Sequence, residues 1–154
     1  MALSAEDRYR TLLEFAGKER ERWRNSKVIM RKEDLKFERS RQGMTAQVVN
    51  PALGFNVHAI SSFIREIPPG KKGGKHRHRM EAIIHILGGR GYSIIDDRKT
   101  EWNEGDTLCI PMWSTHQHFN TDPEKHARLF AVTSIPLMMN LGVLDWEQLG
   151  DADR

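Results

Sequence analysis

From about residue 46 onward the chain is a series of short β-type runs, each closed by a turn signal. The runs are rich in apolar and β-branched residues, and Gly, Pro, Asn and Asp clusters separate them. No helical crossover lies between the runs, so the pattern predicts an antiparallel sandwich or barrel. We therefore expect an all-β fold with strands at 46–50, 55–67, 82–87, 92–96, 107–110 and 128–134.

Helical spacing occurs only at the two ends of the chain. Residues 4–24 carry Tyr9, Leu12, Ala16 and Trp23 at three-, four- and seven-residue spacings among charged residues, which predicts an amphipathic helix. The tail after Pro136 returns to helical spacing and predicts a short C-terminal helix. We expect a helical arm at 1–45 and a barrel with its C-terminal helix at 46–154, which together make one domain.

The charge of the chain belongs to the predicted arm. The whole sequence has 24 Lys and Arg against 21 Asp and Glu, a net charge of +3. Residues 1–45 hold 12 basic and 8 acidic side chains, whereas residues 46–154 hold 12 and 13. Acidic and basic residues are interleaved along the arm, as on an ordinary solvated face, so we expect no nucleic-acid partner.

Three features bear on the compartment. The sequence has no run of about eighteen apolar residues, which a membrane-spanning helix requires. Its first ten residues, MALSAEDRYR, lack the apolar stretch of a signal peptide, and the single cysteine, Cys109, cannot form an intramolecular disulfide. We expect a cytoplasmic protein without a membrane partner.

Two His-x-His pairs carry the chemical signal. His76 and His78 follow Gly70, and His116 and His118 follow Pro111. In a strand, side chains at positions i and i+2 project to the same face, so each pair would present two imidazoles to one interior. Two such pairs, each bracketed by glycine or proline, predict a metal site.

These motifs resemble those of the cupin superfamily. The first cupin motif is matched by Gly70, His76, His78 and Gly89, and the second by Gly105, Pro111, His116 and Asn120, with Trp113 where the family has glycine. The resemblance covers about residues 55–135. It implies a cupin-type antiparallel β-barrel, also called a jelly roll, with a metal in its mouth.

The position where most cupins place a carboxylate ligand is Ala82 in this chain. Glu81 stands one residue early, and a one-residue shift in a strand turns a side chain to the opposite face. We expect a site of His76, His78 and His116 alone. The alternative is a bulge that turns Glu81 inward as a fourth ligand.

Within the cupins, the pattern is similar to the gentisate 1,2-dioxygenase group, whose metal site has three histidines. That resemblance implies His116 as a ligand and His118 as an acid/base group close to the substrate. The family usually has an arginine, associated with the substrate carboxylate, where this chain has Ile84. An apolar residue there would disfavour a carboxylate, which suggests a phenolic or other chelating substrate without one.

Other residues have a predicted place near the substrate. Trp113 stands beside the ligand-bearing turn, where it would either stack on an aromatic substrate or only pack. Ala82 and Ile84 would form the pocket wall, and His58, on an earlier strand, is a further candidate for the lining.

The function that we expect is a non-haem Fe(II) dioxygenase, which cleaves a small phenolic or enolic chelating substrate with O2. Manganese, nickel or zinc are alternative metals. Two other classes of function stay open: a redox-inert metal-dependent isomerase or lyase, and a non-catalytic module that binds a small molecule. We also expect a homodimer, because a partner can cover the edge strands of an open barrel.

Overall fold

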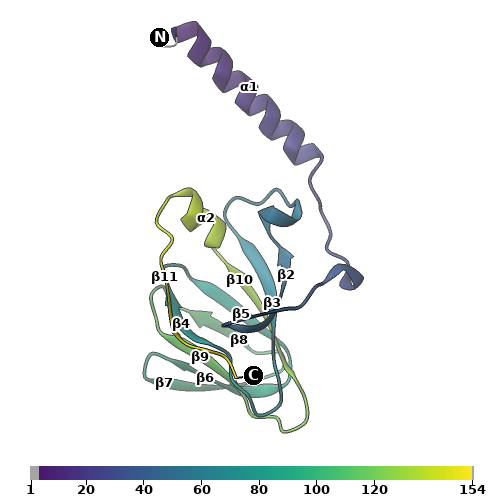
Figure 1. Cartoon of the computed structure of the whole chain (residues 1–154), viewed down its shortest axis with the longest axis vertical. Coiled ribbons are helices and arrows are strands. Elements are labelled where there is room, and N and C mark those ends of the chain that lie inside the picture. The colour runs from purple at the N-terminus through teal and green to yellow at the C-terminus, as the bar shows by residue number, and fades with distance from the viewer. Residues whose placement is uncertain (1–3, 154) are drawn as a thin grey trace.

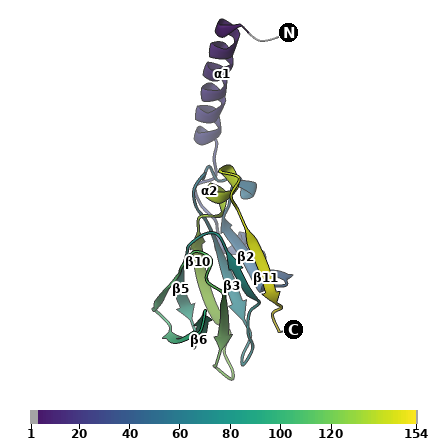
Figure 2. The ribbon, with the colours of Figure 1, turned by 90° about the vertical axis from the view of Figure 1, so that its left-hand side faces the viewer.

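The structure is a computed structural model that describes residues 4–153. Residues 1–3 of the predicted arm and residue 154 of the predicted barrel lie outside that range. Figure 1 shows strands gathered into one unit, from which a long helix, α1 (Ala5–Arg24), projects. After a quarter turn, Figure 2 shows α1 still clear of the strands.

The strands form two antiparallel sheets. The six-stranded sheet has the order β1-β2-β3-β10-β5-β8, and the five-stranded sheet has the order β11-β4-β9-β6-β7. The strands are β1 (Glu38–Ser40), β2 (Gly43–Val49), β3 (Ser61–Ile67), β4 (Lys75–His78), β5 (Ala82–Gly88), β6 (Arg90–Ile95), β7 (Arg98–Asn103), β8 (Thr107–Ile110), β9 (His116–Asn120), β10 (Ala127–Thr133) and β11 (Trp146–Gly150). Together they confirm the predicted all-β fold, a cupin-type β-barrel.

One hydrophobic core fills the space between the sheets, with Ile67, Ile86 and Leu129 from the six-stranded sheet and Trp102 from the five-stranded one. Strand β5 shows how the sequence produces this core. Ala82, Ile84 and Ile86 are buried, whereas the residues between them are exposed, because alternate side chains of a strand point to opposite faces. The inner face of β5 is therefore apolar throughout.

Helix α1 begins at a complete capping box, in which Ser4 and Asp7 bond to each other's backbone N–H groups. None of its residues is buried. Two short 3-10 turns, Lys32–Asp34 and Pro51–Leu53, flank the first two strands. Strands β1 and β2 begin before residue 46, so the six-stranded sheet includes residues from the segment that we assigned to the arm.

The C-terminal tail differs in part from its prediction. A short helix, α2 (Ile135–Asn140), is present, but the helical tail does not continue through residue 149. The chain turns at Gly142, which has a φ of +69°, and Trp146–Gly150 then pairs with β4 as strand β11. The free edge of β4 offers backbone hydrogen bonds that a longer helix would have left unmade. No helix in residues 4–153 is long and apolar enough to cross a membrane.

Candidate metal centre

Strands β4 and β9 bring three imidazoles together. His76 and His116 are direct partners in the β4–β9 pairing, and His78 lies two residues further along β4 on the same face. Their candidate ligand atoms all lie within 4.8 Å of one another. All three side chains are buried, so the arrangement is an internal cluster.

Each of these rings is oriented by a backbone carbonyl. Nδ1 of His76 lies 3.1 Å from the carbonyl oxygen of Gly74, Nδ1 of His78 lies 2.9 Å from that of Met80, and Nδ1 of His116 lies 3.0 Å from that of Ser114. A carbonyl oxygen can only accept, so Nδ1 carries the hydrogen in each neutral ring. The lone pair of Nε2 is therefore available, which is the state that a metal ligand requires.

Burial keeps these rings neutral. It is the largest cause of the lowered pKa of His76 and His78, and it lowers the pKa of His116 to about 4. The positive charge of Arg65 lowers the pKa of all three as well. At neutral pH the cluster thus presents three uncharged nitrogen donors, which fit a divalent first-row metal ion such as iron, manganese, nickel or zinc.

The position of Glu81 does not support the four-ligand alternative. Glu81 is exposed, whereas Ala82 is buried and lines the cavity beside the histidines. Ile84 lines the same cavity. The bulge required to turn Glu81 inward is absent from the regular pairing of β5 with β8, in which Ala82 faces Ile110.

His118 lies in the same cavity but has different partners. Its Nδ1 lies 2.7 Å from Oγ of Ser93, and the indole N–H of Trp102 donates to that Oγ at 3.0 Å. Because Trp102 can only donate, the hydroxyl hydrogen of Ser93 is available to Nδ1 of His118. This pattern favours a neutral His118 with its hydrogen on Nε2, and burial lowers its pKa well below the ordinary value. That Nε2 is buried without a partner among the described residues.

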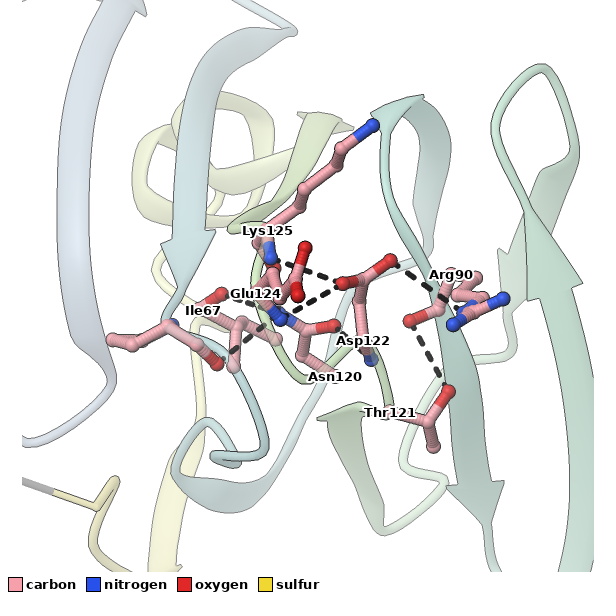
Figure 3. A network of polar contacts seen from close by, with 8 residues as sticks. Ile67, Arg90, Asn120, Thr121, Asp122, Glu124 and Lys125 are labelled. Carbon is pink, nitrogen blue, oxygen red and sulfur yellow. Dashed lines mark hydrogen bonds and ion pairs between the residues drawn. The ribbon is translucent and has the colours of Figure 1, made fainter.

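Asn120, at the end of β9, anchors the strand that carries His116 and His118. Its amide nitrogen donates to the carbonyl oxygens of Ile67 at 2.9 Å and Lys125 at 2.7 Å, and its Oδ1 accepts from the N–H of Asp122 (Figure 3). Asp122 in turn forms an ion pair with Arg90 on β6. The network ties the end of β9 to β3, β6 and the turn before β10.

Two residues of the site were missed by the sequence reasoning. Arg65 on β3 is buried and lines the histidine cavity. Trp146 on β11 stacks on His76 with ring centroids 4.8 Å apart and ring planes 16° apart. Neither residue belongs to a local motif with the histidines. Arg65 lies within the predicted strand at 55–67, and a lone arginine on an inward-facing position was the signal available there.

The site consists of a small inner cavity and a larger outer one. The inner cavity, around the histidines, has a volume of about 20 Å³, which is room for about one water-sized group. The outer cavity has a volume of about 690 Å³ and lies along the segment that precedes β1 and β2. Phe63, Arg65 and Trp146 line both cavities, so they form the boundary between them.

Two predicted pocket residues lie elsewhere. Trp113 is outside the cavity, where Arg77 lies over its ring at 4.8 Å, and its N–H donates to the carbonyl of His78 at 2.8 Å. Its φ of +65° lies in the left-handed region, which is uncommon for a residue other than glycine. His58 is also outside: it lies in the loop before β3, hydrogen-bonds to Asn56 and lies 3.7 Å from the carboxylate of Glu19 on α1. Its region was expected to be strand, but β3 begins only at Ser61.

Known proteins resemble this chain in sequence. Residues 63–133 match the family model described as "Cupin domain". A 1-hydroxy-2-naphthoate 1,2-dioxygenase from Nocardioides sp. (strain KP7) is 26% identical over 103 residues, and a 5-aminosalicylate 1,2-dioxygenase from Comamonas sp. is 26% identical over 102 residues. Each match covers 66% of this chain and 27% of the relative, so the chain spans about a quarter of the length of these curated relatives.

Solved structures have the same fold. A salicylate 1,2-dioxygenase from Pseudaminobacter salicylatoxidans superimposes with a TM-score of 0.62 at 18% identity, over 70% of this chain and 30% of that one. A cupin 2 domain-containing protein from Halorhodospira halophila has a TM-score of 0.56 at 19% identity, over 58% of this chain and 62% of that one. With the two antiparallel sheets, the two histidine motifs and these matches, residues 63–133 form a cupin domain.

Proposed function

We propose that this protein is a non-haem Fe(II)-dependent dioxygenase, which cleaves a small phenolic or enolic chelating substrate with O2. The observation that carries the proposal is the convergence of three neutral imidazoles in a buried cavity without a carboxylate beside them. The names of the relatives support it, since each is a 1,2-dioxygenase.

His76, His78 and His116 would hold the iron through Nε2, because their Nδ1 atoms are engaged by backbone carbonyls. Iron held by three uncharged ligands would supply a redox-active Lewis acid with positions open for a chelating substrate and for O2. The protein's part is to keep the three rings fixed and neutral. The carbonyl bonds and the burial of the rings do this without a metal present.

We propose His118 as the catalytic histidine, with a role that its partners define. With hydrogen on Nε2, it donates a hydrogen bond to negative charge that develops on substrate or oxygen. The family resemblance implied an acid/base role for this residue without its direction. The Trp102–Ser93–His118 chain of hydrogen bonds favours donation first, with Ser93 holding the ring in place.

The size of the inner cavity limits where a substrate ring can lie. About 20 Å³ is too small for a benzene ring, so the ring would stay at the boundary formed by Phe63 and Trp146, with its chelating oxygens directed toward the histidines. The apolar wall of Ala82, Ile84 and Leu129 keeps water from the reacting atoms.

The decisive experiment combines metal content with oxygen uptake. Protein loaded anaerobically with Fe(II) or with Zn(II) is mixed with a panel of hydroquinones, catechols, hydroxybenzoates and β-diketones, and oxygen consumption is followed. We expect uptake with iron only. Turnover with zinc in the absence of oxygen consumption would instead support the redox-inert isomerase or lyase, and ligand binding without turnover would support the binding module.

Matched variants test the assignment of ligands. His116→Ala should lose stoichiometric metal, whereas His118→Ala should keep the metal and lose oxygen uptake. His85→Ala, on the exposed face of β5, should change neither. The fall in metal affinity in His116→Ala should exceed the roughly 10- to 100-fold fall that follows removal of a hydrogen-bond partner of a ligand. Full metal content in His116→Ala would refute the three-histidine assignment.

A further inference from the structure

Arg65 is a buried cation at the boundary between the two cavities. It lies in the middle of β3, opposite Thr45 on β2 and Leu129 on β10, and its side chain is only 6% exposed. Burial lowers its pKa to about 10, so the guanidinium is still charged at neutral pH. A buried charge is costly unless it has a partner of opposite charge.

The chain itself does not supply that partner. Within residues 4–153, no carboxylate forms an ion pair with Arg65, and its Nε is buried without a hydrogen-bond acceptor. The adjacent Glu66 points the other way and pairs with Arg128 at 2.6 Å. The recorded neighbour of the guanidinium is the ring of Phe63, 5.5 Å away. An aromatic face attracts a cation but does not neutralise it.

The inner cavity provides no negative charge for Arg65 either. Glu33, Asp34 and Glu38 line the outer cavity, which Arg65 also borders, but none of them forms an ion pair with it. The described residues that line the inner cavity include neither Asp nor Glu. His76, His78, His116 and His118 line this cavity together with the guanidinium, and an imidazole offers no negative charge to balance it. A divalent metal on His76, His78 and His116 would add two further positive charges. The cavity therefore has an excess of positive charge that its own residues leave unbalanced.

A second unpartnered nitrogen lies in the same cavity. Nε2 of His118 is buried without a partner, and the bond from Ser93 to Nδ1 favours a hydrogen on that Nε2. Arg65 and His118 thus present N–H groups to one enclosed space. Two unmet donors, one of them charged, are suited to an anion and unsuited to an apolar group.

We propose that Arg65 binds a carboxylate of the substrate, which makes the substrate a small hydroxy- or keto-carboxylate and not a neutral phenol. The planar guanidinium can hold a carboxylate through two parallel hydrogen bonds, with the chelating oxygens directed at the histidines. This assignment rests on the proposed function. It also removes the ground for expecting a substrate without a carboxylate, because Arg65 on β3 supplies the cation that Ile84 on β5 does not.

The test compares ligands that differ only in the carboxylate. Gentisate is paired with hydroquinone and salicylate with phenol, and dissociation constants are measured anaerobically by quenching of tryptophan fluorescence. Zinc-loaded and chelator-treated protein are both used, so that neither iron nor turnover is needed. We expect the wild type to prefer the carboxylate of each pair by roughly 10- to 100-fold, the range for a hydrogen-bonded ion pair.

Three variants assign that preference to the residue. Arg65→Met should abolish it, because the carboxylate ligand of each pair loses its ionic partner, and Arg65→Lys, which keeps the charge but not the fork, should retain part of it. Arg128→Met is the matched control, since Arg128 lies on the neighbouring strand, exposed and outside the cavity. Because an apolar residue in place of a buried charge is often neutral or stabilising, Arg65→Met should fold, and its melting temperature checks this.

The results separate the two proposals. The role of Arg65 would be overturned if the wild type shows no preference for the carboxylate ligands, which includes no measurable binding of either ligand of a pair. It would also be overturned if the preference survives in Arg65→Met. A preference that depends on Arg65 in a protein without oxygen uptake would support the anion site and refute the dioxygenase.

Discussion

At the scale of single residues, the chemistry of the site follows from what each histidine bonds through Nδ1. His76, His78 and His116 face backbone carbonyls, so they offer lone pairs at Nε2. His118 faces a serine hydroxyl that accepts from Trp102, so it offers a hydrogen instead. Histidine thus takes two roles in one cavity. The group that lies against Nδ1 decides which role each ring has.

The burial of these histidines predicts a pH dependence of the metal-free protein. Burial lowers the pKa of all four, for His116 to about 4, whereas an unfolded histidine titrates near 6.5. Below about pH 6.5 the unfolded chain therefore binds protons that the folded one does not, so stability falls as the pH falls. Each such histidine contributes about 1.4 kcal/mol per pH unit.

Urea denaturation of chelator-treated protein between about pH 7 and pH 5 measures this slope. Replacement of His116 by Gln should reduce the slope of the unfolding free energy against pH by about the contribution of one histidine. A free energy of unfolding that stays constant over this range would show that the rings are not held neutral.

At the scale of elements, strand parity explains which part of the site could be predicted. The i, i+2 spacing of His76 and His78 places them on one face of β4, and the turn after Pro111 sends His116 back along β9 to meet them. Arg65 and Trp146 could not be found in this way. They come from β3 and β11, and they reach the histidines only through pairings between distant parts of the chain.

The tryptophan that lines the cavity is not the one that the sequence motif singles out. Trp113 stands next to the ligand-bearing turn in sequence, but its ring lies under Arg77 and outside the cavity. Trp146 was assigned to a helix, because its neighbours Leu144 and Leu149 have spacings that also suit a helix. Its pairing with β4 overrides that local pattern.

Strand β11 should act as a cover for the histidines. Trp146 stacks on His76 and lines both cavities, so Trp146→Ala should join them and admit water and solutes. We predict removal of bound zinc by EDTA several-fold faster than in the wild type, and a loss of stability on the order of 1 kcal/mol from the lost stacking. Trp113→Ala is the control, and equal rates in the two variants would count against a covering role.

Helix α1 is the surface that we predict for the expected homodimer. Its Tyr9, Leu12, Leu13, Phe15 and Trp23 are all more than half exposed, and the helix projects away from the strands, where a second copy can lie along it (Figure 2). A double change, Leu12→Glu with Leu13→Glu, should convert a dimer to a monomer in sedimentation velocity. Because α1 buries no residue, the stability of the barrel should change by less than about 0.5 kcal/mol. A wild type that sediments as a monomer would contradict the expected dimer.

At the scale of the whole molecule, the barrel supplies a rigid frame in which several strands meet at one cavity. The β-type runs and turn signals of the sequence predicted that frame, because each strand needs only local alternation and a turn to form. The division into an arm and a barrel, the homodimer and the cytoplasmic location stay predictions. The central proposal concerns the metal, the substrate and the use of O2.

Isotope labelling tests that claim most directly. The iron-loaded protein is given the best substrate of the panel under ¹⁸O2, and the product is analysed by mass spectrometry. The account predicts that both labelled oxygen atoms enter one product molecule, and that the reaction stops in His116→Ala. A product that forms without labelled oxygen, or that forms equally well with zinc, would contradict it.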